Sequence, residues 1–252
     1  MDDTNDAFLD GRVRLKQPAS GYRATSDSVL LAAAVPVQKG QSLLDVGCAS
    51  GIVAACVRAR VGDVRLTGVE VQGDLARLAR ENCPDMEVVC ADITQRIPAL
   101  HGRQFHHVAT NPPFYTEPAA RRNAQQKTAF HQAVPLKAWL AACLKYVRPR
   151  GTLTLVHRME AVPEIVAVLR PKLGALEVIP IVGKAGKPAE RVIVRGVLGS
   201  RKPFAIHAPI IVHNADGTPT DAAVALLRAG QGLAAETKNT PRTKACRPDF
   251  RK

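Results

Sequence analysis

Short apolar segments alternate with helical segments along residues 42–197, and this alternation constrains the fold more than any other feature of the chain. Strands separated by helices favour a parallel sheet with helices on both faces. We expect seven strands, at 42–47, 65–71, 87–91, 104–110, 151–157, 176–182 and 191–197, and helices at 52–61, 74–82, 135–147 and 162–173. The sequence therefore predicts an α/β fold with a doubly wound, mostly parallel sheet.

Residues 1–35 precede the predicted sheet, and we call them the N-terminal lead-in. Residues 1–7 are polar, and we expect them to be frayed. The Asp10-Gly11 pair between apolar residues at 8–15 is a strong hairpin signal. A helix is expected at 28–35, with Thr25, Ser26 and Asp27 as candidate caps.

Composition bounds the domain organisation and the class of partner. Of the 252 residues, 46% are apolar, enough for one large domain, which we place at 1–233. One more strand is expected at 208–213 and a short helix at 220–229, whereas 234–252 is basic and predicted to be a disordered tail. The formal charge of +13 favours a polyanionic partner, with simple solubility as the alternative.

Several classes of site and location are disfavoured. The six cysteines form no C-x-x-C pair, which indicates small buried apolar side chains, with neither a disulfide framework nor a metal site. The N-terminus is acidic, unlike a signal peptide, and no apolar run approaches the roughly 20 residues that span a bilayer. We expect a cytoplasmic protein.

The segment Asn111-Pro112-Pro113-Phe114 directly follows a predicted strand. Each proline holds the residue before it extended, at a strand end where open α/β sheets bind ligands. The Asn111 side-chain oxygen and the Pro112 carbonyl would form a pair of acceptors for a group with two N–H donors, and Phe114 could stack on a planar group. The alternative is a tight loop in which Asn111 satisfies its own backbone.

A second strand-to-helix turn has the features of a nucleotide-type pocket. Residues 45–51 follow the pattern D-x-G-x-small-x-G, with Asp45, Gly47, Ala49 and Gly51 at its positions. Small residues allow a ligand to approach the backbone, and the helix start offers N–H donors. Glu70 ends the next strand and could hold the two ribose hydroxyls.

Asp92 ends the third strand and could accept a hydrogen bond from an adenine amine. The alternative for each acid is a helix cap or a solvated loop residue. The glycine spacing also differs from the dinucleotide fingerprint G-x-G-x-x-G. The turn instead resembles the S-adenosylmethionine loop of class I methyltransferases, and Asn-Pro-Pro-Phe stands where the amino-group enzymes of that class carry their catalytic tetrapeptide. This resemblance implies a Rossmann-like fold.

A narrower resemblance covers residues 8–230. The segments 17–23, 27–32, 129–131, 139–140 and 188–194 look like those of bacterial tRNA (adenine-N6) methyltransferases, which modify the adenine next to the anticodon of a valine tRNA. By that resemblance, Tyr22, Arg23 and Asp27 would close over S-adenosylmethionine, which Asn111 would also contact. Ala49 departs from the usual glycine and would crowd the cofactor slightly.

A basic stretch follows the tetrapeptide. Residues 118–159 contain no acid and eight Lys or Arg residues. We expect Arg121, Arg122 and Lys127 to contact RNA phosphates, and His131 to contact phosphate or base unless it is structural. The expected partner is a single-stranded loop of tRNA, and the enzyme is expected to be a monomer.

The mechanism follows from the acceptor pair. An adenine amine is a poor nucleophile, and two acceptors would draw its nitrogen toward tetrahedral geometry as charge develops. The expected activity is S-adenosylmethionine-dependent N6-methylation of a tRNA adenine. Three alternatives stay open: methylation of a guanine N2 amine in rRNA, methylation of a protein glutamine amide, and a non-catalytic RNA-binding module with the same fold.

Overall fold

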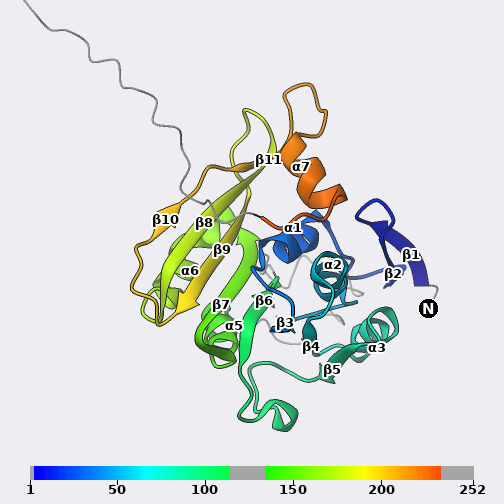
Figure 1. Ribbon diagram of the computed structural model, residues 1–252, viewed down its shortest axis with the longest axis vertical. Coiled ribbons are helices and arrows are strands. Elements are labelled where there is room, and N and C mark those ends of the chain that lie inside the picture. Colours follow the sequence, from blue (N-terminus) through cyan, green and yellow to red (C-terminus); the bar gives the residue numbers. More distant parts are fainter. Residues whose placement is uncertain (1–2, 114–133, 234–252) are drawn as a thin grey trace, which may run out of the picture.

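The computed structural model describes residues 3–113 and 134–233. Its central sheet contains the seven predicted strands in the order β8-β9-β7-β6-β3-β4-β5, with two short strands, β10 and β11, both paired with β8 (Figure 1). The bounds of the seven are β3 Ser42–Val46, β4 Arg65–Glu70, β5 Met86–Cys90, β6 Phe105–Thr110, β7 Val147–Arg158, β8 Leu173–Lys184 and β9 Arg191–Leu198.

The sheet is mostly parallel, as predicted. Strands β5, β4, β3, β6 and β7 run parallel to one another, whereas β9 is antiparallel to both β7 and β8. The carboxyl ends of β3, β4, β5, β6 and β7 therefore meet at one edge. Strand β10 (Ala205–Ile206) is absent from the sequence prediction because two residues carry no periodic signal, whereas β11 (Ile210–His213) corresponds to the strand expected at 208–213.

Helices cover both faces of the sheet. Leu43 and Leu44 are adjacent on β3, and they belong to different apolar clusters because neighbouring strand residues point to opposite faces. One cluster packs beneath α1 (Ser26–Ala34) and α2 (Ile52–Val61), and the other beneath α5 (Leu136–Leu144) and α6 (Val162–Leu169) (Figure 1). The remaining helical segments are α3 Gly73–Asn82, η1 Pro98–Leu100, η3 Met159–Ala161, α7 Asp221–Ala223 and the π-helical turn η4 Val224–Arg228.

The N-terminal lead-in is a hairpin, but its first strand begins earlier than expected. Residues of β1 (Asp3–Phe8) pair antiparallel with β2 (Val13–Pro18), and Asp10 and Gly11 lie in the turn with positive φ. The expectation that residues 1–7 are frayed is therefore wrong for 3–7. The polar residues of β1 are ordered by their partners on β2, a long-range effect that local composition does not reveal.

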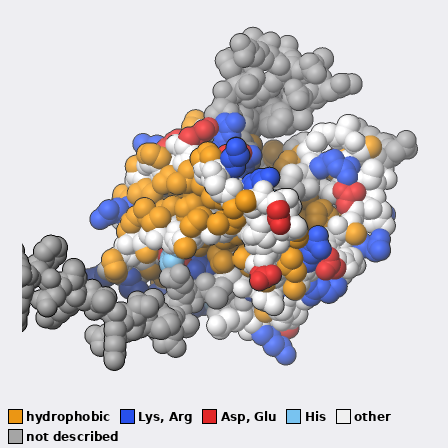
Figure 2. Space-filling view, turned by 90° about the horizontal axis from the view of Figure 1, so that it is seen from above, with side chains coloured by type: hydrophobic (Ala, Val, Ile, Leu, Met, Phe, Trp, Pro, Cys, Tyr) orange, Lys and Arg blue, Asp and Glu red, His pale blue; other side chains and the backbone are white. Residues whose placement is uncertain are grey.

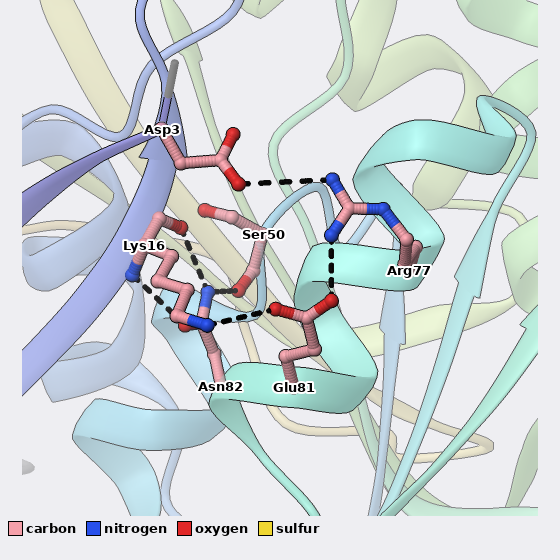
Figure 3. Close-up of polar contacts among 6 residues, drawn as sticks. All are labelled: Asp3, Lys16, Ser50, Arg77, Glu81 and Asn82. Atoms are coloured by element: carbon pink, nitrogen blue, oxygen red, sulfur yellow. Dashed lines mark hydrogen bonds and ion pairs between the residues drawn. The ribbon is translucent and has the colours of Figure 1, made fainter. Parts of the chain in front are cut away.

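The side chain of Asn82 joins this hairpin to the rest of the fold (Figure 3). Its Oδ1 accepts the Lys16 N–H at 2.9 Å, and its Nδ2 donates to the Lys16 carbonyl at 2.9 Å. The same Nδ2 donates to the Ser50 carbonyl at 2.9 Å. Asn82 thus fastens the edge of β2 to the turn that follows β3.

The remaining contacts in this region are ion pairs between exposed groups. Glu81 pairs with Lys16 at 3.1 Å and with Arg77 at 2.5 Å, and Arg77 reaches Asp3 at 3.7 Å (Figure 3). Solvent screens such pairs, so each adds little to stability.

We predict that Asn82→Ala lowers the free energy of unfolding by about 1–3 kcal/mol, because three hydrogen bonds between separate segments are lost. Urea unfolding measures this change. The control is Glu81→Ala, which removes the two neighbouring ion pairs and should cost less than about 1 kcal/mol. An equal loss in the two variants would contradict the role of Asn82.

None of the helices within residues 3–113 and 134–233 combines the length and apolarity needed to cross a membrane. The tail proposed at 234–252 lies outside the described residues.

Candidate active site

The turn after β3 brings small residues and buried acids together. Gly47, Ala49 and Gly51 all have positive φ, at 72°, 47° and 91°. A side chain at Gly47 would lie 3.3 Å from Cζ2 of Trp139, and one at Gly51 would lie 3.1 Å from Sγ of Cys83. Glycine is required at both positions by backbone conformation and by close neighbours.

Ala49 is the one turn residue with a side chain in this left-handed region. Its N–H donates to Oε2 of Glu70 at 3.0 Å, and this hydrogen bond holds the conformation that glycine would adopt more easily. The departure from the usual glycine is therefore accommodated within the fold.

Glu70 lies where the sequence predicts, at the end of β4, and is 5% exposed. Besides the Ala49 N–H, it accepts the Gln72 N–H at 2.9 Å through Oε1. Burial raises the pKa of Glu70, and its bonds to the backbone N–H groups of Gln72, Ala49 and Val71 oppose that rise. Each carboxylate oxygen has a second lone pair, so the same group can also accept ribose hydroxyls.

Asp45 is the most strongly perturbed acid at this edge. It is 2% exposed, and its Oδ2 has no hydrogen-bond partner among the described residues. Burial, reinforced by the charge of Glu70, raises the pKa of Asp45 to about 7. A buried acceptor without a partner is a costly arrangement that a cationic or N–H-bearing ligand would relieve.

Asn111 directly follows β6, and its side chain contacts Tyr22, which belongs to the N-terminal lead-in. Its Nδ2 donates to the Tyr22 hydroxyl at 3.5 Å, whereas its buried Oδ1 has no partner within the described structure. Burial raises the pKa of Tyr22, hydrogen bonds with Ser28 and Asn111 lower it, and the charges of Asp45 and Glu70 raise it. Tyr22 thus lies within hydrogen-bond distance of Asn111 and within electrostatic reach of Asp45 and Glu70.

The other predicted cofactor residues have structural partners. Arg23 forms an ion pair with Asp6 and donates to the Thr4 hydroxyl at 2.9 Å, so it is bound to the hairpin. Asp27 accepts from Nε of Arg191 at 3.1 Å, and it lies inside the first turn of α1 without capping it.

Asp92 accepts from the backbone N–H of Thr94 at 2.8 Å and from its hydroxyl at 2.7 Å, which shapes the loop after β5. This contact corresponds to the loop role that the sequence left open. Phe114, Arg121, Arg122, Lys127 and His131 lie outside the described residues, and their expected roles stay predictions.

A hydrogen-bond chain that the sequence does not reveal joins the two strand ends. Trp139 Nε1 donates to Oγ1 of Thr110 at 2.9 Å, and this hydroxyl donates to the Val46 carbonyl at 2.9 Å. Val46 and Thr110 are register partners on β3 and β6. The chain therefore sets the spacing between the turn that begins at Gly47 and the edge that begins at Asn111.

These residues fit S-adenosylmethionine, the cofactor implied by the resemblance. The turn is built from small residues with positive φ, Asp45 offers a carboxylate oxygen that has no partner among the described residues, and Glu70 keeps free lone pairs. Asn111 supplies a separate unpaired acceptor at the neighbouring strand end.

Comparison with known proteins gives a consistent result. The family model for the methyltransferase small domain matches residues 20–180. A curated relative from Aeromonas hydrophila, named tRNA1(Val) (adenine(37)-N6)-methyltransferase, is 29% identical over 223 residues, which cover 86% of this chain and 93% of the relative.

Two solved structures share the fold. One from Agrobacterium tumefaciens, titled as a predicted O-methyltransferase, has a TM-score of 0.70 and 25% identity, and covers 84% of this chain and 100% of that chain. A 16S rRNA N2 G1207 methyltransferase from T. Thermophilus, in complex with AdoMet and guanosine, has a TM-score of 0.54 and 18% identity. That match covers 78% of this chain and 50% of the other chain.

We predict that Thr110→Val lowers the free energy of unfolding by about 1–3 kcal/mol, because Trp139 Nε1 and the carbonyl of the buried residue Val46 both lose their hydrogen-bond partner. Cofactor affinity, measured by calorimetry, should fall as well. The matched variant Thr110→Ser keeps the hydroxyl, and its missing methyl group should cost only about 1 kcal/mol. Equal effects of the two substitutions would show that the hydroxyl does not hold the strand ends.

A pH dependence follows from Asp45. Its pKa is near 4 in the unfolded chain and about 7 in the folded protein. The folded protein therefore holds a proton between these values that the unfolded chain releases. This contribution to stability is complete below about pH 4 and is lost as the pH rises through about 7.

Asp45→Asn removes this titration. Thermal unfolding without cofactor should show wild type losing stability relative to Asp45→Asn from pH 5 to 7, with a constant difference at higher pH. Parallel profiles for the two proteins would contradict the raised pKa.

Proposed function

Since this chain belongs to the methyltransferase small domain family, we propose that it transfers a methyl group from S-adenosylmethionine to N6 of an adenine in tRNA. The curated relative is named for adenine 37 of a valine tRNA, which we propose as the position modified. The observation that carries the proposal is the buried Oδ1 of Asn111, which has no hydrogen-bond partner among the described residues and lies at a strand end next to the strands that carry the buried acids.

Each part of the edge has a distinct task. The turn at 47–51, Asp45 and Glu70 would hold the cofactor, which supplies an activated methyl group when bound. Asn111 would bind the acceptor amine through Oδ1, because its Nδ2 is directed to the Tyr22 hydroxyl. The Pro112 carbonyl would take the second N–H of the same amine.

These two acceptors raise the reactivity of the amine. The lone pair of an adenine amine is delocalised into the ring, and hydrogen bonds to both N–H groups favour a tetrahedral nitrogen. Positive charge develops on that nitrogen during transfer, so both bonds strengthen in the transition state and lower the barrier. The carbonyl of Pro112 and the amide oxygen of Asn111 carry no proton, and neither acts as a strong base.

RNA as the substrate agrees with the charge of the chain. The formal charge is +13, and a phosphate backbone would neutralise part of it. On the face seen from above in Figure 2, lysine and arginine side chains surround an extended apolar area and are not gathered in a single patch. Net charge therefore supports nucleic acid in general without locating the docking surface.

The experiment that tests the function is methyl transfer to tRNA transcripts, followed by mass spectrometry of the nucleosides. We expect N6-methyladenosine in valine tRNA, and its loss in RNA from cells that lack the gene. The product N2-methylguanosine, or labelled protein glutamine, would select an alternative substrate. RNA binding without affinity for S-adenosylmethionine would favour a non-catalytic module.

We predict that Asn111→Ala lowers the transfer rate at least about 100-fold, because the loss of one preorganised hydrogen-bonding group at a developing charge has effects of that size. Calorimetry should show nearly unchanged cofactor affinity. Tyr22→Phe is the companion variant, because it leaves Oδ1 of Asn111 in place and removes the hydroxyl that orients the Asn111 side-chain amide. We expect its transfer rate to fall less than that of Asn111→Ala. Equal loss of rate and cofactor affinity in Asn111→Ala would indicate a structural role.

A further inference from the structure

A second cleft lies between the hairpin and the helices, with a volume of about 290 Å³. Its walls come from the hairpin around β2, from one face of α2, from β4, and from the turn between α3 and β5. Ala54, Leu66 and Met86 contribute apolar surface to its lining. It shares no residue with the predicted cofactor and acceptor sites, so the mechanism described above does not use it.

Positive charge dominates the lining of this cleft. Arg12, Arg14 and Arg58 line it together with one acid, Asp85. Arg12 donates to two neutral backbone carbonyls, those of Leu9 at 3.2 Å and of Arg228 at 3.0 Å, and it forms no ion pair within the described residues.

Arg14 and Arg58 form no ion pair within residues 3–113 and 134–233. Burial raises the pKa of the Cys83 thiol in the cleft wall, and the positive charge of nearby Arg58 opposes that rise. Guanidinium groups that are not held in ion pairs can bind phosphate oxygens through their paired N–H donors.

The backbone of β2 adds to this donor set. Asn82 binds both the N–H and the carbonyl of Lys16, which shows that these groups point away from β1. Backbone groups two residues apart on a strand point the same way, so the N–H of Arg14 is directed from the same free edge toward the cleft. The side chains of Arg12, Arg14 and Lys16 likewise share one exposed face of the hairpin.

We propose that this cleft binds backbone phosphates of the RNA substrate, at a distance from the reacting base. The identity of the ligand as RNA rests on the proposed function, whereas its phosphate chemistry rests on the cleft. Arg14 is four residues before Pro18, which corresponds to about 13 Å along the strand, and the chain then reaches Tyr22 at the candidate active site. One strand therefore connects the two surfaces, and RNA bound at both would lie along the hairpin.

The test compares two double variants with the same loss of charge. Arg14→Gln/Arg58→Gln removes the two unpaired guanidinium groups. Arg170→Gln/Lys172→Gln removes two exposed basic residues beside the start of β8, and it serves as the control. Binding of tRNA is measured by fluorescence anisotropy over a range of salt concentrations, and cofactor affinity by calorimetry.

We expect Arg14→Gln/Arg58→Gln to weaken tRNA binding at least about tenfold, as the loss of charged hydrogen bonds does. The slope of log affinity against log salt concentration should decrease in magnitude by about one to two, which corresponds to the loss of one to two phosphate contacts. Cofactor affinity should stay within twofold, which also verifies folding. Unchanged tRNA affinity, or an equal loss in the control, would overturn the proposal.

A pyrophosphate titration separates the two sources of phosphate. If the cleft variant loses pyrophosphate affinity but keeps tRNA affinity, the cleft serves a free phosphate ligand and the RNA assignment is wrong. Failure of the proposed function is distinguishable, because it would appear as absent methyl transfer by wild type. Loss of tRNA binding in the cleft variant would support RNA docking even then.

Discussion

The parallel pairing of β3 with β6 is the constraint on which the candidate site depends. It sets Val46 beside Thr110, and the Thr110 hydroxyl joins the two strands by donating a hydrogen bond to the Val46 carbonyl. Trp139 holds that hydroxyl from α5 and also lies against Gly47. The turn that begins at Gly47 and the edge that begins at Asn111 each lie one residue beyond this contact, so buried structure sets the spacing between the proposed cofactor turn and the proposed acceptor edge.

The buried acids at this edge lower the stability of the ligand-free protein and provide groups that a ligand can bind. Asp45 and Glu70 are both buried; burial raises the pKa of each, and the charge of Glu70 raises the pKa of Asp45 further. Backbone N–H groups satisfy Glu70, whereas one oxygen of Asp45 has no partner in the part of the chain that the structure describes. A pocket of this kind is incomplete without its ligand, and such strain is typical of binding sites in otherwise well-packed folds.

The hairpin links the functional surfaces of the molecule. Through Asn82 it is fastened to Ser50 in the turn after β3, and through Arg23 and Asp6 it holds the segment that carries Tyr22. Its free edge forms one wall of the basic cleft. Arg23 and Asp27, which the sequence analysis expects to contact cofactor, have ion-pair partners that position this segment, and their contact with cofactor stays a prediction.

Local patterns in the sequence determined the seven principal strands, the small-residue turn and the location of Asn111, because burial and proline geometry act on neighbouring residues. Tertiary structure decided the rest. Trp139 meets Thr110, Asn82 meets Lys16, and β1 becomes ordered only when distant segments pair. The ion-pair partners of Arg23 and Asp27 were also decided by tertiary structure, since the sequence around a charged side chain does not indicate which distant residue it will contact.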